Sequence, residues 1–97
     1  MKSAPVIVCS NNAVLFGRCA DVNADPLTLV DARQAYYWVN PGGHMGLAGA
    51  DERAPIGPQA GSRVGAKGTI LLRNIACVIA VTDAAAKAWD EWPITTG

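Results

Sequence analysis

The sequence predicts a small α+β domain. A mainly antiparallel sheet or an open barrel is expected to carry a short helix near residues 32–39 and a C-terminal helix over 82–92. Three observations predict this class. Apolar, β-branched runs of strand length alternate with Gly, Pro and Asn turn residues along most of the chain. An alanine-rich segment near the C-terminus has the periodicity of a helix. A length of 97 residues supports one hydrophobic core, so residues 1–97 are expected to form a single domain.

Composition excludes several classes of protein. The formal net charge is zero and 51% of the residues are hydrophobic, which is typical of a folded domain. The basic residues are scattered, whereas a nucleic-acid-binding domain clusters them to neutralise phosphates. The longest apolar run, 70–81, contains Arg73 and is too short to cross a bilayer as a helix. We therefore expect a cytoplasmic protein with no nucleic-acid partner and no membrane partner.

The N-terminal third reads as strands. Pro5–Ser10 is a β-branched run, the pair at 11–12 is an Asn-Asn turn signal, and 13–23 resumes an extended pattern, which predicts a hairpin. Gly17, in the middle of the second strand, indicates a bulge or a close approach of another chain segment. A third strand is expected over Leu27–Val30.

After Val30 the periodicity of the apolar residues changes from that of a strand to that of a helix. The spacing i, i+3, i+4, i+7 of one helix face is found at Ala32, Ala35, Tyr36 and Val39. Asp31 is a suitable N-cap, and Gln34 completes a pair that resembles a capping box. This favours a short helix with Ala35, Tyr36 and Val39 in the core. The alternative is one long strand through Trp38, which the β-propensity of the aromatic residues favours.

The second half contains a long loop, further strands and a helix. Gly42–Gly61 is rich in Gly, Ala and Pro and is expected to be a loop, with a strand near Met45–Ala48. Ser62–Ala66 is expected to be a short strand that ends in a Lys-Gly turn. Thr69–Val81 is apolar on both faces, which indicates a central strand or two strands joined near 73–74. In the last helix, Thr82 is the expected N-cap and Pro93 ends the segment.

No motif in the chain supports catalysis or metal binding. Gly61–Thr69 resembles a phosphate-binding loop but lacks Gly directly before Lys67 and Ser or Thr directly after it. The glycines around His44 lack the spacing of a dinucleotide fingerprint, and His44 has no companion ligands for zinc. The three cysteines are widely spaced in apolar strand-like segments, where buried cysteine behaves as a small hydrophobe. We expect a protein that is not an enzyme and uses no cofactor.

The aromatic cluster after the third strand is the expected site. Tyr36, Tyr37 and Trp38 cannot all enter so small a core, so some of this cluster is expected on the surface. The predicted ligand-binding residues are Arg33, Tyr37, Trp38 and His44, with the Pro41–Gly49 loop beside them. Aromatic and arginine side chains can stack on a base, or they can anchor a protein interface. Three interpretations stay open: core packing with an oligomer interface, a small-ligand pocket, and contact with another protein.

The order of these features resembles a family of small, uncharacterised proteins of tailed phages and prophages. The matching segments are PVIV at 5–8, VLFG at 14–17, LTLVDARQAYYW at 27–38, GLAG at 46–49 and GSRVGAKGTILLRNIACVIAVTDAA at 61–85. The resemblance implies a phage origin and a domain of unknown function, and it implies no activity.

These observations lead to one hypothesis and two alternatives. The first is a phage accessory protein for counter-defence in the cytoplasm of the infected bacterium. It would be a homo-oligomer that binds and sequesters a host factor, and the candidate factor is a nucleotide-like immune signal held between subunits. The second is a minor virion protein, such as a decoration or connector subunit. The third is a protein that binds and inhibits a host enzyme.

Overall fold

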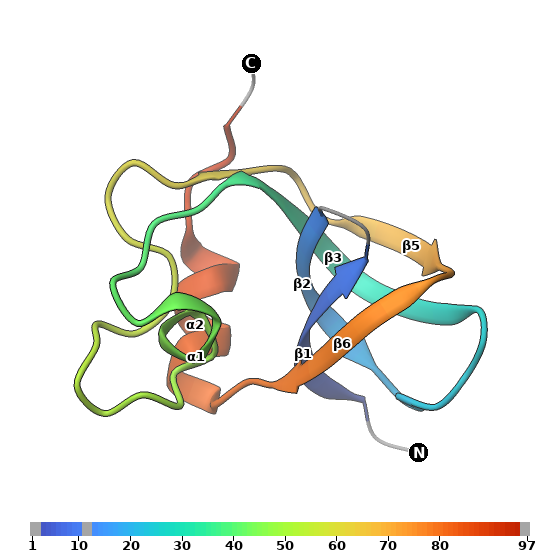
Figure 1. Ribbon diagram of the computed structural model, residues 1–97. Helices are drawn as coiled ribbons and strands as arrows, with labels where there is room; N and C mark the ends of the chain where they lie inside the picture. Colours follow the sequence, from blue (N-terminus) through green and yellow to red (C-terminus); the bar gives the residue numbers. More distant parts are fainter. Residues whose placement is uncertain (1–2, 11–12, 96–97) are drawn as a thin grey trace.

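A computed structural model describes residues 3–10 and 13–95 and has the predicted α+β class (Figure 1). In this part of the chain, six strands form an antiparallel, open sheet in the order β4-β3-β2-β1-β6, with β5 also paired to β3. The strands are β1 (Ala4–Ser10), β2 (Ala13–Cys19), β3 (Leu27–Tyr37), β4 (Arg63–Val64), β5 (Gly68–Leu72) and β6 (Ile75–Ala80). The helices are α1 (Gly43–Ala48) and α2 (Asp83–Glu91). The expected Asn-Asn turn at 11–12 lies outside the described residues.

The sheet is strongly curved. β5 and β6 are joined by the short turn predicted near 73–74, where Asn74 has a φ of 60°. They nevertheless pair with different strands, β5 with β3 and β6 with β1. In Figure 1 the two strands meet at the edge of the sheet farthest from the helices, while α1, α2 and the long loops lie together on the other side. Of the two alternatives for 69–81, one central strand or two strands joined near 73–74, the second is confirmed.

Successive side chains of β1 and β2 point to opposite faces of the sheet and form two apolar clusters, one on each face. Val6 and Val8 point to the concave side, where Leu27 and Leu29 join them. Their neighbour Ile7 points to the opposite side, where α2 covers the sheet. Because adjacent residues of a strand face opposite ways, β1 and β2 can fill both clusters without charged residues.

A helix over 32–39 is wrong, because β3 continues as a strand to Tyr37. Asp31 is not an N-cap but has a φ of 52° at an irregularity of β3. From Val30 to Arg33 the strand advances three residues while its partner β2 advances two, from Arg18 back to Phe16. This is a β-bulge, and the extra residue reverses which face the following side chains occupy.

The helical spacing of Ala32, Ala35, Tyr36 and Val39 does not correspond to one buried face. Ala32 belongs to the concave cluster, Ala35 belongs to the cluster under α2, and Tyr36 is 62% exposed. The close approach predicted at Gly17 is present, because a Cβ atom there would lie 2.5 Å from Leu29 Cγ.

The expected strand near Met45–Ala48 is also wrong, because this segment belongs to helix α1. Asn40 organises the loop around it. Its side-chain amide donates to Pro55 O and Gly57 O, both at 2.8 Å, and its side-chain oxygen accepts from Gly42 N at 2.7 Å. A Cβ atom at Gly46 would collide with that oxygen, so the position requires glycine. The buried Asn40 side chain thus supplies hydrogen bonds to the backbone of the loop, and the absence of a side chain at Gly46 of α1 leaves room for it.

Helix α2 confirms the prediction for 82–92 within one residue at each end. Thr82 Oγ1 accepts a hydrogen bond from Ala85 N at 3.3 Å, as expected of an N-cap. Trp89 is fully buried, stacks on Phe16 with ring centroids 5.3 Å apart, and donates from Nε1 to Leu47 O at 3.0 Å. One tryptophan therefore joins α2 to both the sheet and α1. Within the described residues, neither helix is long and apolar enough to cross a membrane.

Candidate functional site

Arg33 is a buried cation that ties the sheet to the end of α2. Its side chain, 1% exposed, donates from Nη1 to Trp89 O at 2.6 Å and to Trp92 O at 2.7 Å, and from Nε to Gly65 O at 2.7 Å. The last carbonyls of a helix have no partner within the helix and carry partial negative charge. Helix α2 has no basic residue in its own last turn, so Arg33 supplies that charge from β3.

One nitrogen of Arg33 is not used in this arrangement. Nη2 is buried and has no hydrogen-bond partner among residues 3–10 and 13–95. Burial lowers the pKa of the guanidinium from its ordinary value, and nearby Asp90 opposes that change. Arginine stays protonated in proteins, so Nη2 remains a charged donor. A buried charged donor without an acceptor is costly, and its presence requires an explanation.

The unpaired nitrogen belongs to a residue that lines a pocket of about 450 Å³, which we call the Arg33 pocket. The lining residues are Arg33, Lys67, Asp90, Trp92, Pro93 and Ile94. The segment after α2 forms one wall and is held against β4, where Thr95 N donates to Val64 O at 2.8 Å. Trp92 is fixed in the same way, because its Nε1 donates to Ser62 O at 3.1 Å. The pocket thus combines an apolar wall with charged groups.

Positive charge predominates around the pocket. Asp90 accepts two hydrogen bonds from Arg18, at 2.7 and 3.2 Å, and pairs with Lys67 at 3.3 Å. The hydrogen bonds from Arg18 hold the pKa of the Asp90 carboxyl below its usual range, although partial burial opposes them. One carboxylate therefore faces three cations, since Arg33 lies beside it as well. Such a site favours an anionic ligand.

Acidification is expected to remove the stabilisation that Asp90 provides. A carboxyl with a lowered pKa in the folded state stabilises the fold above its unfolded pKa, roughly 4, and this contribution is lost as the pH falls through the folded pKa. Asp90→Asn should lower the free energy of unfolding by at most about 1 kcal/mol at pH 7, because the pair is partly exposed. Urea unfolding from pH 7 down to about pH 2 should show the difference from the wild type vanish. Glu91→Gln, on the same helix, is the control, and a difference independent of pH would contradict the assignment.

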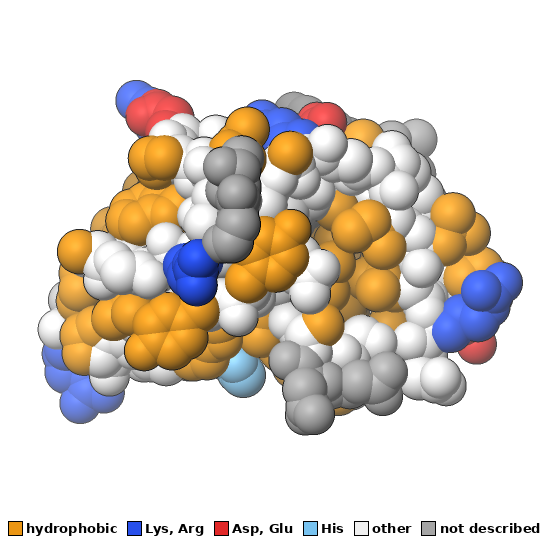
Figure 2. Space-filling view, turned by 90° about the horizontal axis from the view of Figure 1, so that it is seen from above, with side chains coloured by type: hydrophobic (Ala, Val, Ile, Leu, Met, Phe, Trp, Pro, Cys, Tyr) orange, Lys and Arg blue, Asp and Glu red, His pale blue; other side chains and the backbone are white. Residues whose placement is uncertain are grey.

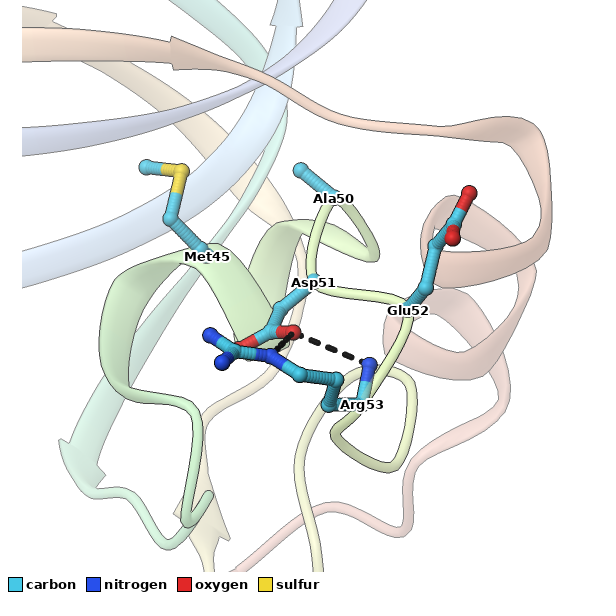
Figure 3. A pocket seen from close by; sticks show the side chains of 5 residues that line it. All are labelled: Met45, Ala50, Asp51, Glu52 and Arg53. Carbon is cyan, nitrogen blue, oxygen red and sulfur yellow. Dashed lines mark hydrogen bonds and ion pairs between the residues drawn. The ribbon is translucent and has the colours of Figure 1, made fainter.

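A second hollow lies beside α1 and is lined by Met45, Ala50, Asp51, Glu52 and Arg53 (Figure 3). Asp51 accepts from Arg53 N at 2.9 Å and from Arg53 Nε at 3.3 Å, and these hydrogen bonds lower the pKa of its carboxyl. In Figure 3, Met45 and Glu52 point away from this pair. Asp51 and Arg53 satisfy each other at the surface, so this hollow is a weaker candidate than the Arg33 pocket.

The residues predicted from sequence do not come together in one site. Arg33 lines the pocket, but the expectation that it lies on the outer side is wrong because it is buried under α2. Trp38 and His44 touch each other, with ring centroids 5.2 Å apart, away from the pocket lining. Tyr37 is 59% exposed, and Tyr36, which was expected in the core, is 62% exposed. The bulge at Asp31 turns Arg33 to the face under α2, and a second irregularity in the pairing of β3 with β4 follows between Ala35 and Tyr37.

Sequence reasoning missed Lys67, Asp90 and Trp92 as members of the site. Lys67 was interpreted only as a turn residue. Helix α2 has no basic residue in its last turn, but the neighbours of Arg33 in the sequence are Ala32 and Gln34, so nothing local marks this arginine as the cation that meets the helix.

The fold and the pocket describe a small α+β protein with a buried arginine at a surface pocket. The chain belongs to the family described as a domain of unknown function (DUF6948), whose model matches residues 3–89. No curated protein and no solved structure matches the chain.

Proposed function

We propose that this protein binds a small anionic, nucleotide-like molecule in the Arg33 pocket and does not transform it. The observation that carries the proposal is Arg33 Nη2, a buried charged donor without a partner among the described residues, on a side chain that lines the pocket. Solvent does not reach Nη2 in this structure, so a phosphate or carboxylate oxygen would supply the missing acceptor after a small shift of the pocket lining. Such charge-assisted hydrogen bonds are about twice as strong as neutral ones.

The rest of the lining fits such a ligand. Lys67 adds a second, partly exposed cation at the mouth, and Trp92 and Ile94 offer apolar surface for a base or another flat group. The guanidinium and the Trp92 ring are already fixed by hydrogen bonds, so little ordering is needed when a ligand binds. The lining residues include no nucleophile, and Asp90 is occupied by Arg18 and Lys67. This supports binding without catalysis.

The biological setting of the proposal comes from the resemblance of the sequence to phage proteins. In that setting, the bound molecule would be a nucleotide-like signal of the infected bacterium, and tight binding would sequester it. The described lining residues come from one chain, and the proposal keeps the homo-oligomer that was expected from the sequence.

Lys67→Ala is expected to weaken binding of the anion roughly 10- to 150-fold while leaving the fold intact, because a charge-assisted hydrogen bond contributes about 1.5–3 kcal/mol. Lys67 is partly exposed and pairs only weakly with Asp90, so stability should change little. Binding is measured by calorimetry and thermal shift with inorganic phosphate, pyrophosphate, adenosine monophosphate and a cyclic dinucleotide. Lys87→Ala, an exposed lysine of the same chain outside the lining, is the matched control. No shift with any of these probes, or equal affinity in both variants, would contradict the proposal.

A second candidate function, contact with another protein, is supported by a different observation. Tyr36 and Tyr37 are adjacent in β3 and both largely exposed, although neighbouring side chains of a strand point opposite ways. Figure 2 shows apolar side chains across much of one face of the molecule, with charged side chains mainly toward its margin. A host enzyme or a virion neighbour could use such a surface. Native mass spectrometry of protein purified from its host distinguishes this candidate, since it predicts a bound protein that Tyr37→Ala releases.

A further inference from the structure

Cys9 and Cys77 are separated by most of the chain but lie directly opposite each other in neighbouring strands. β1 and β6 are antiparallel, and their register pairs Cys9 with Cys77. Opposite residues of such strands have Cα atoms about 4.5–5.5 Å apart and side chains on the same face. A disulfide spans Cα separations of about 4.4–6.8 Å. The register therefore places the two Cα atoms within the range of separations that a disulfide spans.

The two thiols differ in their surroundings. Cys9 is buried in the cluster under α2, whereas Cys77 is exposed on β6, so the expectation that all three cysteines are buried is wrong for Cys77. Burial, with a smaller contribution from a hydrogen bond with the Cys77 thiol, raises the pKa of Cys9 to about 11. An oxidant in solution thus reaches Cys77 first, and the protected Cys9 thiol lies against it.

The ladder is irregular beside this pair. β6 takes two steps, from Cys77 to Ile75, where β1 takes one, from Cys9 to Ser10. Such a bulge bends the strand and loosens its pairing locally. β6 is also an edge of the sheet, since among the described residues it pairs only with β1. Small adjustments of the Cys77 backbone are therefore less restricted than they would be in a central strand.

We propose that Cys9 and Cys77 are a redox-active pair that forms a cross-strand disulfide in response to peroxide. The thiolate of Cys77 attacks hydrogen peroxide, becomes a sulfenic acid and releases hydroxide, which is protonated to water. The Cys9 sulfur then attacks the Cys77 sulfur, the S–S bond forms, the S–O bond breaks, and the Cys9 proton leaves with the oxygen as a second water. Two thiols are oxidised by two electrons in total, and one peroxide is reduced to two waters.

The disulfide would join two strands that the chain connects only through the rest of the domain. Cross-linking residues that are distant in sequence restricts the unfolded chain, so the oxidised protein should unfold at a higher temperature than the reduced protein. Cys19 is buried in the cluster on the concave side of the sheet, opposite the face that Cys9 shares with α2, so it is not expected to take part. The inference is independent of the Arg33 pocket.

To test this, the reduced full chain is oxidised with hydrogen peroxide at low protein concentration. The intact mass of the protein and its peptide map are then measured by mass spectrometry. We expect a mass loss of two hydrogen atoms, a linked Cys9–Cys77 peptide, and reversal by dithiothreitol. Cys19→Ala should respond like the wild type. Cys9→Ala should instead accumulate Cys77 sulfinic acid or dimers linked through Cys77, because the resolving thiol is missing.

A wild-type protein that takes up oxygen on Cys77 while Cys9 remains a free thiol would overturn the proposal. So would a disulfide that includes Cys19. Phenylarsine oxide, which bridges two neighbouring thiols, gives a second measurement. It should bind the reduced wild type in equimolar amount and should fail to bind Cys77→Ser, an exposed substitution that does not threaten the fold.

Discussion

Arg33→Met is expected to lower the free energy of unfolding by about 2–4 kcal/mol. Methionine fills much of the same volume but leaves the carbonyls of Gly65 and Trp92 without their donor, and an orphaned buried acceptor costs about 1–3 kcal/mol. The cost at Trp89 O is smaller, because this oxygen also accepts a hydrogen bond from Trp92 N at 3.3 Å. The end of α2 loses its compensating charge at the same time.

Urea unfolding followed by far-ultraviolet circular dichroism measures this effect. Arg53→Met is the matched control, because the Arg53 side chain is 91% exposed and, among residues 3–10 and 13–95, its ion pair is with Asp51, so stability should hardly change. Arg33→Lys should fall between them, since it restores the charge but not the planar fork of donors. If Arg33→Met were as stable as the wild type, Arg33 would not cap α2, and the residue would serve the ligand alone.

Trp89→Ala is expected to have the largest effect in the chain, about 3–5 kcal/mol of destabilisation. Trp89 is fully buried in the cluster between the sheet and α2, where its ring lies parallel to that of Phe16, with an angle of 6° between the planes. Alanine would leave a cavity and would remove the hydrogen bond to Leu47 O that connects α2 to α1. A loss of this size is a large part of the stability of a small domain.

Trp89→Phe keeps the prediction measurable if the alanine variant does not fold. Phenylalanine retains most of the stacking on Phe16 but cannot donate to Leu47 O, so we expect a smaller loss of about 1–3 kcal/mol. The matched control is Tyr37→Ala, an aromatic truncation at an exposed position of β3 that should change stability little. Circular dichroism is the suitable probe, because removal of a tryptophan alters the fluorescence baseline. Equal losses at the two positions would contradict this account of the core.

Local signals in the sequence determined the elements whose stability depends on their own residues. Thr82 and the proline that follows α2 define that helix, since a cap and a stop act within one turn. Asn74, at the turn between β5 and β6, has the positive φ that asparagine tolerates. The fold class followed from these signals, together with the apolar strands of β1 and β2.

Long-range contacts decided the rest. Pairing with β2, β4 and β5 keeps β3 extended, and the bulge at Asp31 turns Arg33 to the face under α2. Sequence reasoning did select Arg33, though as a surface residue. Its partners on α2 lie 56 and 59 residues away, so no local pattern could show that it caps that helix or that one of its nitrogens lacks a hydrogen-bond partner among the described residues. Local chemistry determines where strands and helices can begin and end, whereas register determines which side chains meet, because a shift of one residue exchanges the two faces of a strand.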